Sequence, residues 1–532
     1  MSKRKLLRLT AMVFMAFALP WGADVGLAFG VPGGTPDYFN TPNWAYTPPL
    51  RKFVDTLPGL GFGNRNNLNQ YIPVAIPDTA TYDGSDYYEI ELGEYSEKMH
   101  SDLPPTRLRG YRQTNTTDNS VRQFRYLGPL IIAQRNRPIR IKFTNALPTG
   151  AGGNLFIPMD NTVMGAGAFE INYNPETNEP IPTTTGMFKE NRATLHLHGG
   201  RTPWISDGTP HQWITPRGED TPYPKGDADG NTIAGCAGQT TCGAAGATNN
   251  PGAGAQTFYW TNQQSARLMF YHDHAWGITR LNVYAGEAAG FLLTDQTEQD
   301  LLNAGLIPGE QIPLIIQDKT YVDAATIGSW DPTWNWGTTP PVPNTGDLWW
   351  PHVYMPAQNP YNPDLSGVNA YGRWHYGPWF FPATNVPFGP VPNPLYDPDC
   401  EPNLVVFCQP PENPGTPNPS WGAEAFMDTP VINGTAYPAV TVQPRSYRLR
   451  ILNAAHDRFF NLQFYIADNT VAAGCPTCVP ATEVKMVPAI EYPADPTWPS
   501  TWPADGRVGG VPDWKTAGPD WIQIGTEGGF LP

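Results

Sequence analysis

The sequence of 532 residues is poor in charge, because only 15% of its residues are Asp, Glu, Lys or Arg. Helix bundles present charged faces to solvent. This scarcity, together with 53 Gly and 60 Pro, favours an all-β chain with many turns. Basic residues are outnumbered by acidic ones, with 33 Lys and Arg compared with 48 Asp and Glu. Binding to nucleic-acid phosphates needs clustered basic residues, so this balance argues against nucleic acid as a partner.

Long apolar runs are missing as well. A membrane-spanning helix needs roughly 20 apolar residues, and no such run follows the N-terminus, so no membrane span is predicted. The first residues combine a basic stretch at 3–8, an apolar stretch at 9–19 and a small-x-small pattern at 26–28. This pattern predicts a cleavable signal peptide over residues 1–28 and a periplasmic, outer-surface or extracellular protein. The alternatives are an N-terminal membrane anchor or a buried helix.

Cysteine is scarce, with six residues in the whole chain. In an exported protein these cysteines meet an oxidising compartment, which favours local disulfides. The pairs expected from proximity in sequence are Cys236 with Cys242, Cys400 with Cys408, and Cys475 with Cys478. The last pair has the spacing of a redox motif, but a loop disulfide is the favoured interpretation.

Short apolar runs separated by Pro, Gly and Asn are typical of strands in a β-sandwich. They lie at residues 88–92, 130–133, 139–143, 268–271, 289–293, 312–317, 439–442, 446–452 and 461–465. A short helix is expected over 298–304, where one domain could give way to the next. Residues 328–422 are rich in Pro, Trp, Asn and Gly and are expected to form a long loop region.

Four of the nine histidines form two His-x-His pairs, His196 with His198 in TLHLHGG and His272 with His274 in FYHDHAW. Residues i and i+2 of a strand project from the same face, so each pair offers two imidazoles to one side. Two such strands side by side bring four nitrogens into one small volume. Imidazole suits copper, zinc, iron and nickel, so the pattern predicts a metal site. The alternative is a hydrogen-bonded polar core.

The segments around these pairs resemble the first domain of multicopper oxidases, in the branch with bacterial spore-coat laccases, bilirubin oxidases and manganese oxidases. The resemblance is carried by LHLHGG, SDGTPHQW and NQQSARLMFYHDHAWGITRLNVYAGEAAGFLL. Two later segments of this sequence, TPVINGTAYPAVTVQPRSYRLRILNAAHDRFFNLQFY and WIQIGTEGGFLP, resemble the second domain of that branch. The likeness covers much of residues 120–532. It implies tandem cupredoxin-like Greek-key β-sandwich domains over 31–297 and 312–532, the second carrying the 328–422 loop.

The resemblance also implies a copper cofactor and the role of each paired histidine. His196 matches a ligand of the type 2 copper, His198 and His272 match ligands of one type 3 copper, and His274 matches a ligand of the other. The family is laccase-like: it couples one-electron oxidation of a phenolic, tetrapyrrole or metal-ion substrate to reduction of O2 to water. The expected partners are therefore O2 and a small reducing substrate or metal ion. The remaining histidines that match no ligand motif, and are expected to be structural, include His211, His352, His375 and His456.

Asp207 follows the first histidine pair, in the sequence SDG. In the branch that the chain resembles, an acidic residue at this position lies near the copper cluster and assists proton delivery, which O2 reduction requires. An Asp before Gly208 is equally typical of a simple turn. Both interpretations remain open from the sequence.

The family's third domain supplies a His-Pro-x-His-x-His motif and a His-Cys-His motif, and this sequence contains neither. The type 1 copper ligands and half of the trinuclear ligands are therefore expected to be absent, and the second domain incomplete. The chain is interpreted as the N-terminal part of an exported oxidase, inactive alone, that needs a C-terminal domain or a second polypeptide. The alternative is a non-catalytic copper-binding or structural protein on a cupredoxin scaffold.

Overall fold

The structure is a computed structural model of the chain. It describes residues 47–157, 186–226, 251–327, 343–350, 427–456, 459–468, 483–487 and 511–531, with isolated positions between 159 and 169 and short pieces between 391 and 413. The predicted signal peptide, all six cysteines and most of the 328–422 loop region lie outside the described residues.

One sheet of the first sandwich follows the order β2-β1-β4-β6. Its strands are β1 (Asp86–Glu97), β2 (Thr106–Gln113), β4 (Ile139–Asn145) and β6 (Ala255–Trp260). β1 runs antiparallel to β2 and parallel to β4, which in turn runs antiparallel to β6. A parallel neighbour cannot be reached through a tight hairpin, so the chain leaves this sheet between β2 and β4.

The second sheet has the order β3-β8-β7-β5, and β3 is its strand that lies between β2 and β4 in sequence. The strands of this sheet are β3 (Leu127–Gln134), β5 (His196–His198), β7 (Arg267–His272) and β8 (Ala288–Thr294). β3 pairs with β8 in parallel, whereas β7 runs antiparallel to both β8 and β5. The chain therefore passes repeatedly between two sheets, as expected of a sandwich.

The space between these sheets is filled by the apolar residues of strands in which apolar and polar residues alternate. Tyr88, Ile90 and Leu92 of β1 are fully buried, and they meet Tyr271 of β7 and Phe291 of β8 in one apolar cluster. Alternate residues of each strand point inward, so the period of two seen in the sequence forms this core. The all-β fold class predicted from the sequence is confirmed.

Helices are few and short among the described residues. The α-helices are α2 (Asn119–Arg122), α3 (Thr279–Ala285) and α4 (Gln296–Asn303). The 3-10 turns are η1 (Phe62–Asn64), η2 (Gly150–Gly153), η3 (Trp204–Ser206), η4 (Pro210–Gln212) and η6 (Trp514–Thr516). α4 forms close to the predicted 298–304 helix, and the Asp295 side chain caps it by accepting from Glu298 N. In the part of the chain that is described, no helix is long and apolar enough to cross a bilayer.

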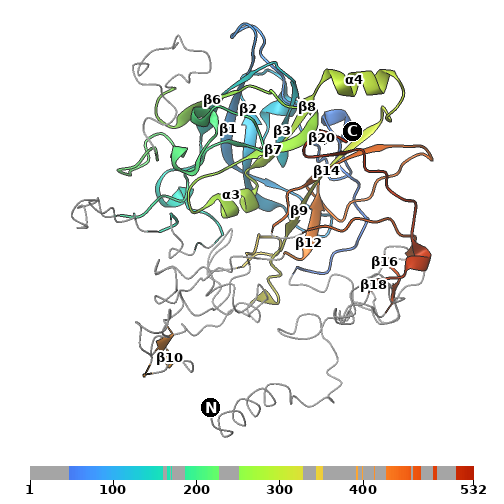
Figure 1. Cartoon of the computed structure of the whole chain (residues 1–532). Helices are drawn as coiled ribbons and strands as arrows, with labels where there is room; N and C mark the ends of the chain where they lie inside the picture. Colours follow the sequence, from blue (N-terminus) through green and yellow to red (C-terminus); the bar gives the residue numbers. More distant parts are fainter. Residues whose placement is uncertain are drawn as a thin grey trace.

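A third four-stranded sheet lies next to β7 and β8 (Figure 1). Its order is β13-β12-β9-β14, with β9 (Gln311–Lys319), β12 (Thr429–Ile432), β13 (Thr435–Ala436) and β14 (Arg448–Asn453). Two-stranded ribbons are formed by β10 (Val391–Pro392) with β11 (Glu412–Asn413), β15 (Ala467–Asp468) with β16 (Glu483–Val484), β17 (Met486–Val487) with β18 (Val511–Pro512), and β19 (Gly525–Thr526) with β20 (Gly529–Phe530). The predicted strands at 439–442 and 461–465 are wrong. Only isolated bridges form there, from Thr56 to Ala439 and from Tyr465 to Ala517.

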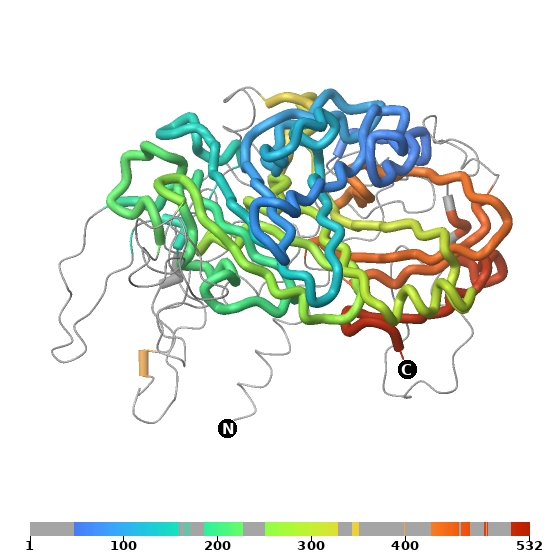
Figure 2. Tube along the Cα trace, turned by 90° about the horizontal axis from the view of Figure 1, so that it is seen from above, coloured from blue at the N-terminus to red at the C-terminus, as the bar shows by residue number. Residues whose placement is uncertain are grey.

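Residues 47–75 form an N-terminal arm that runs along the third sheet (Figure 2). Phe53 N donates to the Tyr437 carbonyl at 3.0 Å, and the Gln70 amide donates to the Gly434 carbonyl at 2.7 Å. The arm therefore binds the β12–β13 hairpin although it precedes the first sandwich in sequence.

A second apolar cluster joins the first sandwich to the third sheet, and a lysine is buried inside it. Lys319 of β9 is 1% exposed, and its Nζ donates to the Tyr284 carbonyl at 2.6 Å. The same Nζ lies over the rings of Tyr126 and Tyr284, at 5.3 and 4.7 Å from their centroids. Burial lowers the pKa of Lys319 from 10.5 to about 7, against the opposing effect of Asp318.

This lysine predicts a stability that rises with pH. Between pH 7 and 10.5 the unfolded chain binds the proton that folded Lys319 releases, so the free energy of unfolding increases by at most about 1.4 kcal/mol per pH unit. Lys319→Met removes this titration. Denaturant unfolding should be measured near pH 7 and near pH 10. Between these values the free energy of unfolding should increase more for the natural protein than for the variant. Parallel pH profiles for the two proteins would contradict the burial.

Candidate metal centre

The two histidine pairs lie on adjacent antiparallel strands, β5 and β7. His196 is paired with His272, Leu197 with Tyr271, and His198 with Phe270. Leu197 and Tyr271 are 1% and 0% exposed because they point into the sandwich core. Alternation along each strand then turns the histidines to the opposite face. The predicted convergence of the two pairs follows from this register.

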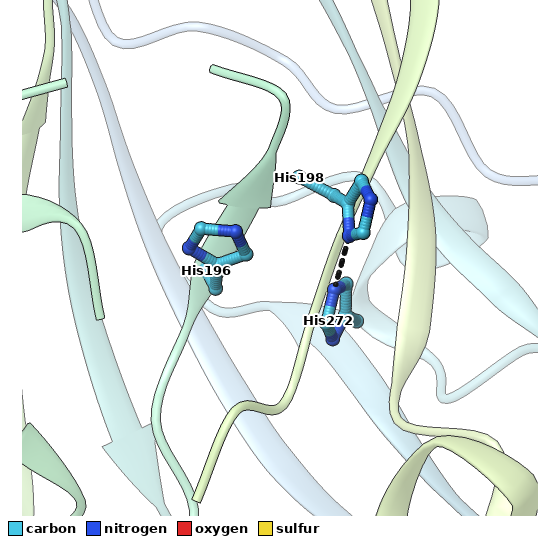
Figure 3. A group of neighbouring side chains, drawn as sticks. All are labelled: His196, His198 and His272. Atoms are coloured by element: carbon cyan, nitrogen blue, oxygen red, sulfur yellow. Dashed lines mark hydrogen bonds between the residues drawn. The ribbon is translucent and has the colours of Figure 1, made fainter. Parts of the chain in front are cut away.

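The imidazoles of three histidines form one group of potential metal ligands (Figure 3). One nitrogen from each of His196, His198 and His272 lies within 4.8 Å of the others, and His198 Nδ1 is 3.0 Å from His272 Nε2. The fourth ring, of His274, has its centroid 4.7 Å from that of His196 and 5.8 Å from that of His272. The structure thus gathers all four histidines of the predicted site.

Backbone carbonyls fix the orientation of two of these rings. His196 Nδ1 lies 2.7 Å from the Asp207 carbonyl, and His272 Nδ1 lies 2.5 Å from the Asp273 carbonyl. A carbonyl only accepts hydrogen bonds, so each Nδ1 carries the proton and each Nε2 keeps its lone pair. Metal-binding imidazoles in proteins are oriented in this way by a partner on the second nitrogen.

The surroundings favour the neutral form of three of the imidazoles, those of His198, His272 and His274. Burial lowers the pKa of His272 to about 3, and burial together with the neighbouring histidines also lowers the pKa of His198 and of His274. His274 Nδ1 is buried and has no hydrogen-bond partner among the described residues. Neutral nitrogen donors, one of them without a partner, fit a divalent transition metal that imidazole binds well.

Phe270 was not singled out by the sequence patterns, yet it packs on two of the histidines. Its ring is stacked on His198 with centroids 4.8 Å apart and on His272 with centroids 4.9 Å apart. Phe270 lies two residues before His272 and opposite His198, so strand alternation places it on the metal-facing side. That spacing is the sequence signal that would have identified it.

Asp207 lies at the end of η3, directly before Gly208. Its carboxylate accepts from Thr202 Oγ1 at 2.6 Å and lies 3.7 Å from His196 Nδ1, while its carbonyl holds the same nitrogen more closely. Both expected features are therefore present, a turn and a carboxylate beside a paired histidine.

The other histidines lie elsewhere. His211 is exposed, with its ring centroid 5.2 Å from that of Trp276, and His456 packs edge-on against Tyr284 and Trp350 in the second apolar cluster. His352 and His375 are outside the described residues.

Gly208 brings the loop that carries Asp207 against the start of β5. Its φ is +67°, and a Cβ at this position would overlap the Leu195 carbonyl and lie 3.2 Å from His196 N. Only glycine combines this left-handed conformation with so close an approach.

The chain is similar in sequence to curated laccases. No protein-family model matches the chain. It is 25% identical over 451 residues to a laccase of Bacillus subtilis (strain 168), covering 83% of this chain and 58% of that protein. It is 26% identical over 456 residues to a laccase of Haloferax volcanii, covering 85% and 51%. The chain spans about half the length of the curated relatives it matches.

Among solved structures, the chain is similar to a laccase from Pediococcus acidilactici. The superposition has a TM-score of 0.36 and 16% sequence identity, and it covers 79% of this chain and 51% of that one.

Gly208→Ala is expected to destabilise the protein by more than about 2 kcal/mol, because backbone strain adds to the overlap with β5. Gly84→Ala is the matched control, since Gly84 has a φ of +73° but nothing within 4 Å of an added Cβ. It should cost only about 1 kcal/mol. Thermal and denaturant unfolding of both variants check this, and equal losses would contradict the close approach.

Proposed function

The chain belongs to the multicopper oxidase family, and we propose that its paired histidines bind copper as part of the cluster at which the oxidase reduces O2 to water. The observation that supports this most directly is the pairing of His196 with His272, which brings both His-x-His motifs to one face. Bound copper would supply one-electron redox chemistry. The contribution of this chain is to hold the imidazoles together, with a ring nitrogen of His196 and of His272 turned to a backbone carbonyl.

The role of each histidine is proposed from its place in the family motif. His196 would bind the type 2 copper, His198 and His272 one type 3 copper, and His274 the other. The short distance between His198 Nδ1 and His272 Nε2 supports a copper ion shared by these two residues. The His274 ring lies next to the His196 ring, which supports a second ion beside the first.

Four imidazoles are too few for a cluster of three copper ions. We therefore propose that the remaining ligands, and those of the type 1 copper, come from a further domain or a second polypeptide. The reducing substrate would be a phenol, a tetrapyrrole or a metal ion. The basic and apolar N-terminal pattern supports export to the periplasm, the outer surface or the medium.

We also propose that the Asp207 carboxylate carries protons toward the site of O2 reduction. Its support is geometric, since the carboxylate is 35% exposed and lies 3.7 Å from a His196 nitrogen. The group therefore meets both solvent and the histidine cluster, as a proton carrier must.

The copper proposal predicts that the folded chain binds Cu(II) and that His196→Ala and His272→Ala each weaken binding at least about 10-fold, because each removes a ligand nitrogen. His211→Ala is the matched control, since this exposed histidine is not a member of the ligand group. Its Kd should stay within about 2-fold of the natural value. Titration calorimetry checks all three, and unchanged Kd values in both alanine variants of the pairs would exclude this site.

For Asp207, the change to Asn should leave copper content intact, because a backbone carbonyl holds His196. O2 consumption by the complete oxidase should fall about 10-fold or more, since an amide does not take up and release protons as a carboxylate does. Thr202→Val removes only the hydroxyl that donates to the carboxylate and should have a smaller effect. A full rate in Asp207→Asn would leave Asp207 as a turn residue.

A further inference from the structure

Asp273 lies between His272 and His274 in sequence, yet its side chain is fully buried. Every hydrogen bond to its carboxylate comes from an N–H group. Oδ1 accepts from Thr194 N at 2.9 Å, and Oδ2 accepts from Asn282 Nδ2 at 3.0 Å. Ala275 N is shared, at 3.2 Å from Oδ1 and 3.1 Å from Oδ2. A carboxylate has acceptors only, so this set of donors fits it well.

These contacts join three separate pieces of chain around the histidines. Thr194 is two residues before His196, at the entrance to β5. Ala275 directly follows His274, and Asn282 lies in α3. The Asp273 carboxylate thus connects three elements. These are the segment that carries the first histidine pair, the segment that carries the second pair, and helix α3.

The Asn282 amide is itself held in one orientation. Its Nδ2 also donates to the Arg192 carbonyl at 3.1 Å, and its Oδ1 accepts from Arg109 Nη1 at 3.3 Å. Reversing the amide would lose both bonds, so its N–H stays directed at Asp273. The backbone of Asp273 is fixed as well, because its N donates to the Glu287 carbonyl at 3.1 Å.

We propose that Asp273 is a positioning residue that holds the two histidine pairs at the separation needed to share metal ions. The inference rests on the proposed role of these histidines as metal ligands. The Asp273 carbonyl accepts from His272 Nδ1, so any shift of this residue also turns a ligand ring. Its carboxylate keeps that carbonyl in place relative to the entrance of β5.

Asparagine cannot replace this residue despite its equal size. In either orientation its NH2 group would face an N–H donor, from Thr194 and Ala275 on one side or from Asn282 and Ala275 on the other. At least one buried donor would lose its partner, and the segment would have to move.

The decisive variant is Asp273→Asn in the full chain, with Cu(II) as the probe. The Kd for Cu(II) should rise at least about 10-fold, as is typical when a residue that orients metal ligands is lost. The electron paramagnetic resonance spectrum of the bound Cu(II) should change, since ligand geometry determines it.

Asp55→Asn is the matched control. Asp55 is also fully buried and accepts from Ser101 N and Asn67 Nδ2, both at 2.7 Å, but it belongs to the N-terminal arm. This variant should lower the melting temperature and leave the Kd and the spectrum unchanged. An equal loss of copper affinity in Asp55→Asn would show that general destabilisation is responsible and would overturn the proposal.

The remaining outcomes separate the two proposals. If the natural chain binds no Cu(II), the proposed function fails. If it binds and Asp273→Asn has the same Kd and spectrum, only the positioning role fails. If Asp273→Asn does not fold, Asn282→Ala decides, since it removes the donor from α3 to Asp273 together with the amide's bonds to the Arg192 carbonyl and Arg109. A weaker Kd with an altered spectrum supports the role, and an unchanged Kd overturns it.

Discussion

The pairing of β5 with β7 is the constraint on which the metal centre depends. A slip of β5 by one residue would turn its two histidines toward the core and expose Leu197. A slip of β7 would in the same way bury His272 and expose Tyr271. Those two apolar residues are almost completely buried, so the hydrophobic core itself keeps the register. The geometry of the site is thus stabilised by side chains that never touch it.

The supports around the histidines act from several directions and use different chemistry. Phe270 packs on two rings, backbone carbonyls of Asp207 and Asp273 bind two ring nitrogens, and Gly208 lets a loop approach the start of β5. Most of this support comes from the backbone, which pre-organises the rings before any ion is bound.

Sequence patterns were sufficient where local alternation decides the outcome. The His-x-His spacing fixed which face each pair occupies, and most apolar runs became strands. The run at 461–465 failed because alternation indicates a face and does not supply a partner strand, and Leu462 and Phe464 remain 39% and 44% exposed. The backbone carbonyls that bind the ring nitrogens could not be predicted, because any residue type provides a carbonyl. The same holds for the backbone hydrogen bonds between the N-terminal arm and the β12–β13 hairpin, which only the folded structure shows.

The solvent exposure of the imidazole rings decreases from one side of the site to the other. His198 is exposed, His196 is partly exposed, and His272 is 5% exposed with its Nε2 in contact with His198 Nδ1. A solute arriving from water therefore meets the His198 ring before the His272 ring. The deepest nitrogen becomes available only when the His198 ring proton leaves it, so the exposed ring and the buried ring must change their hydrogen bonding together.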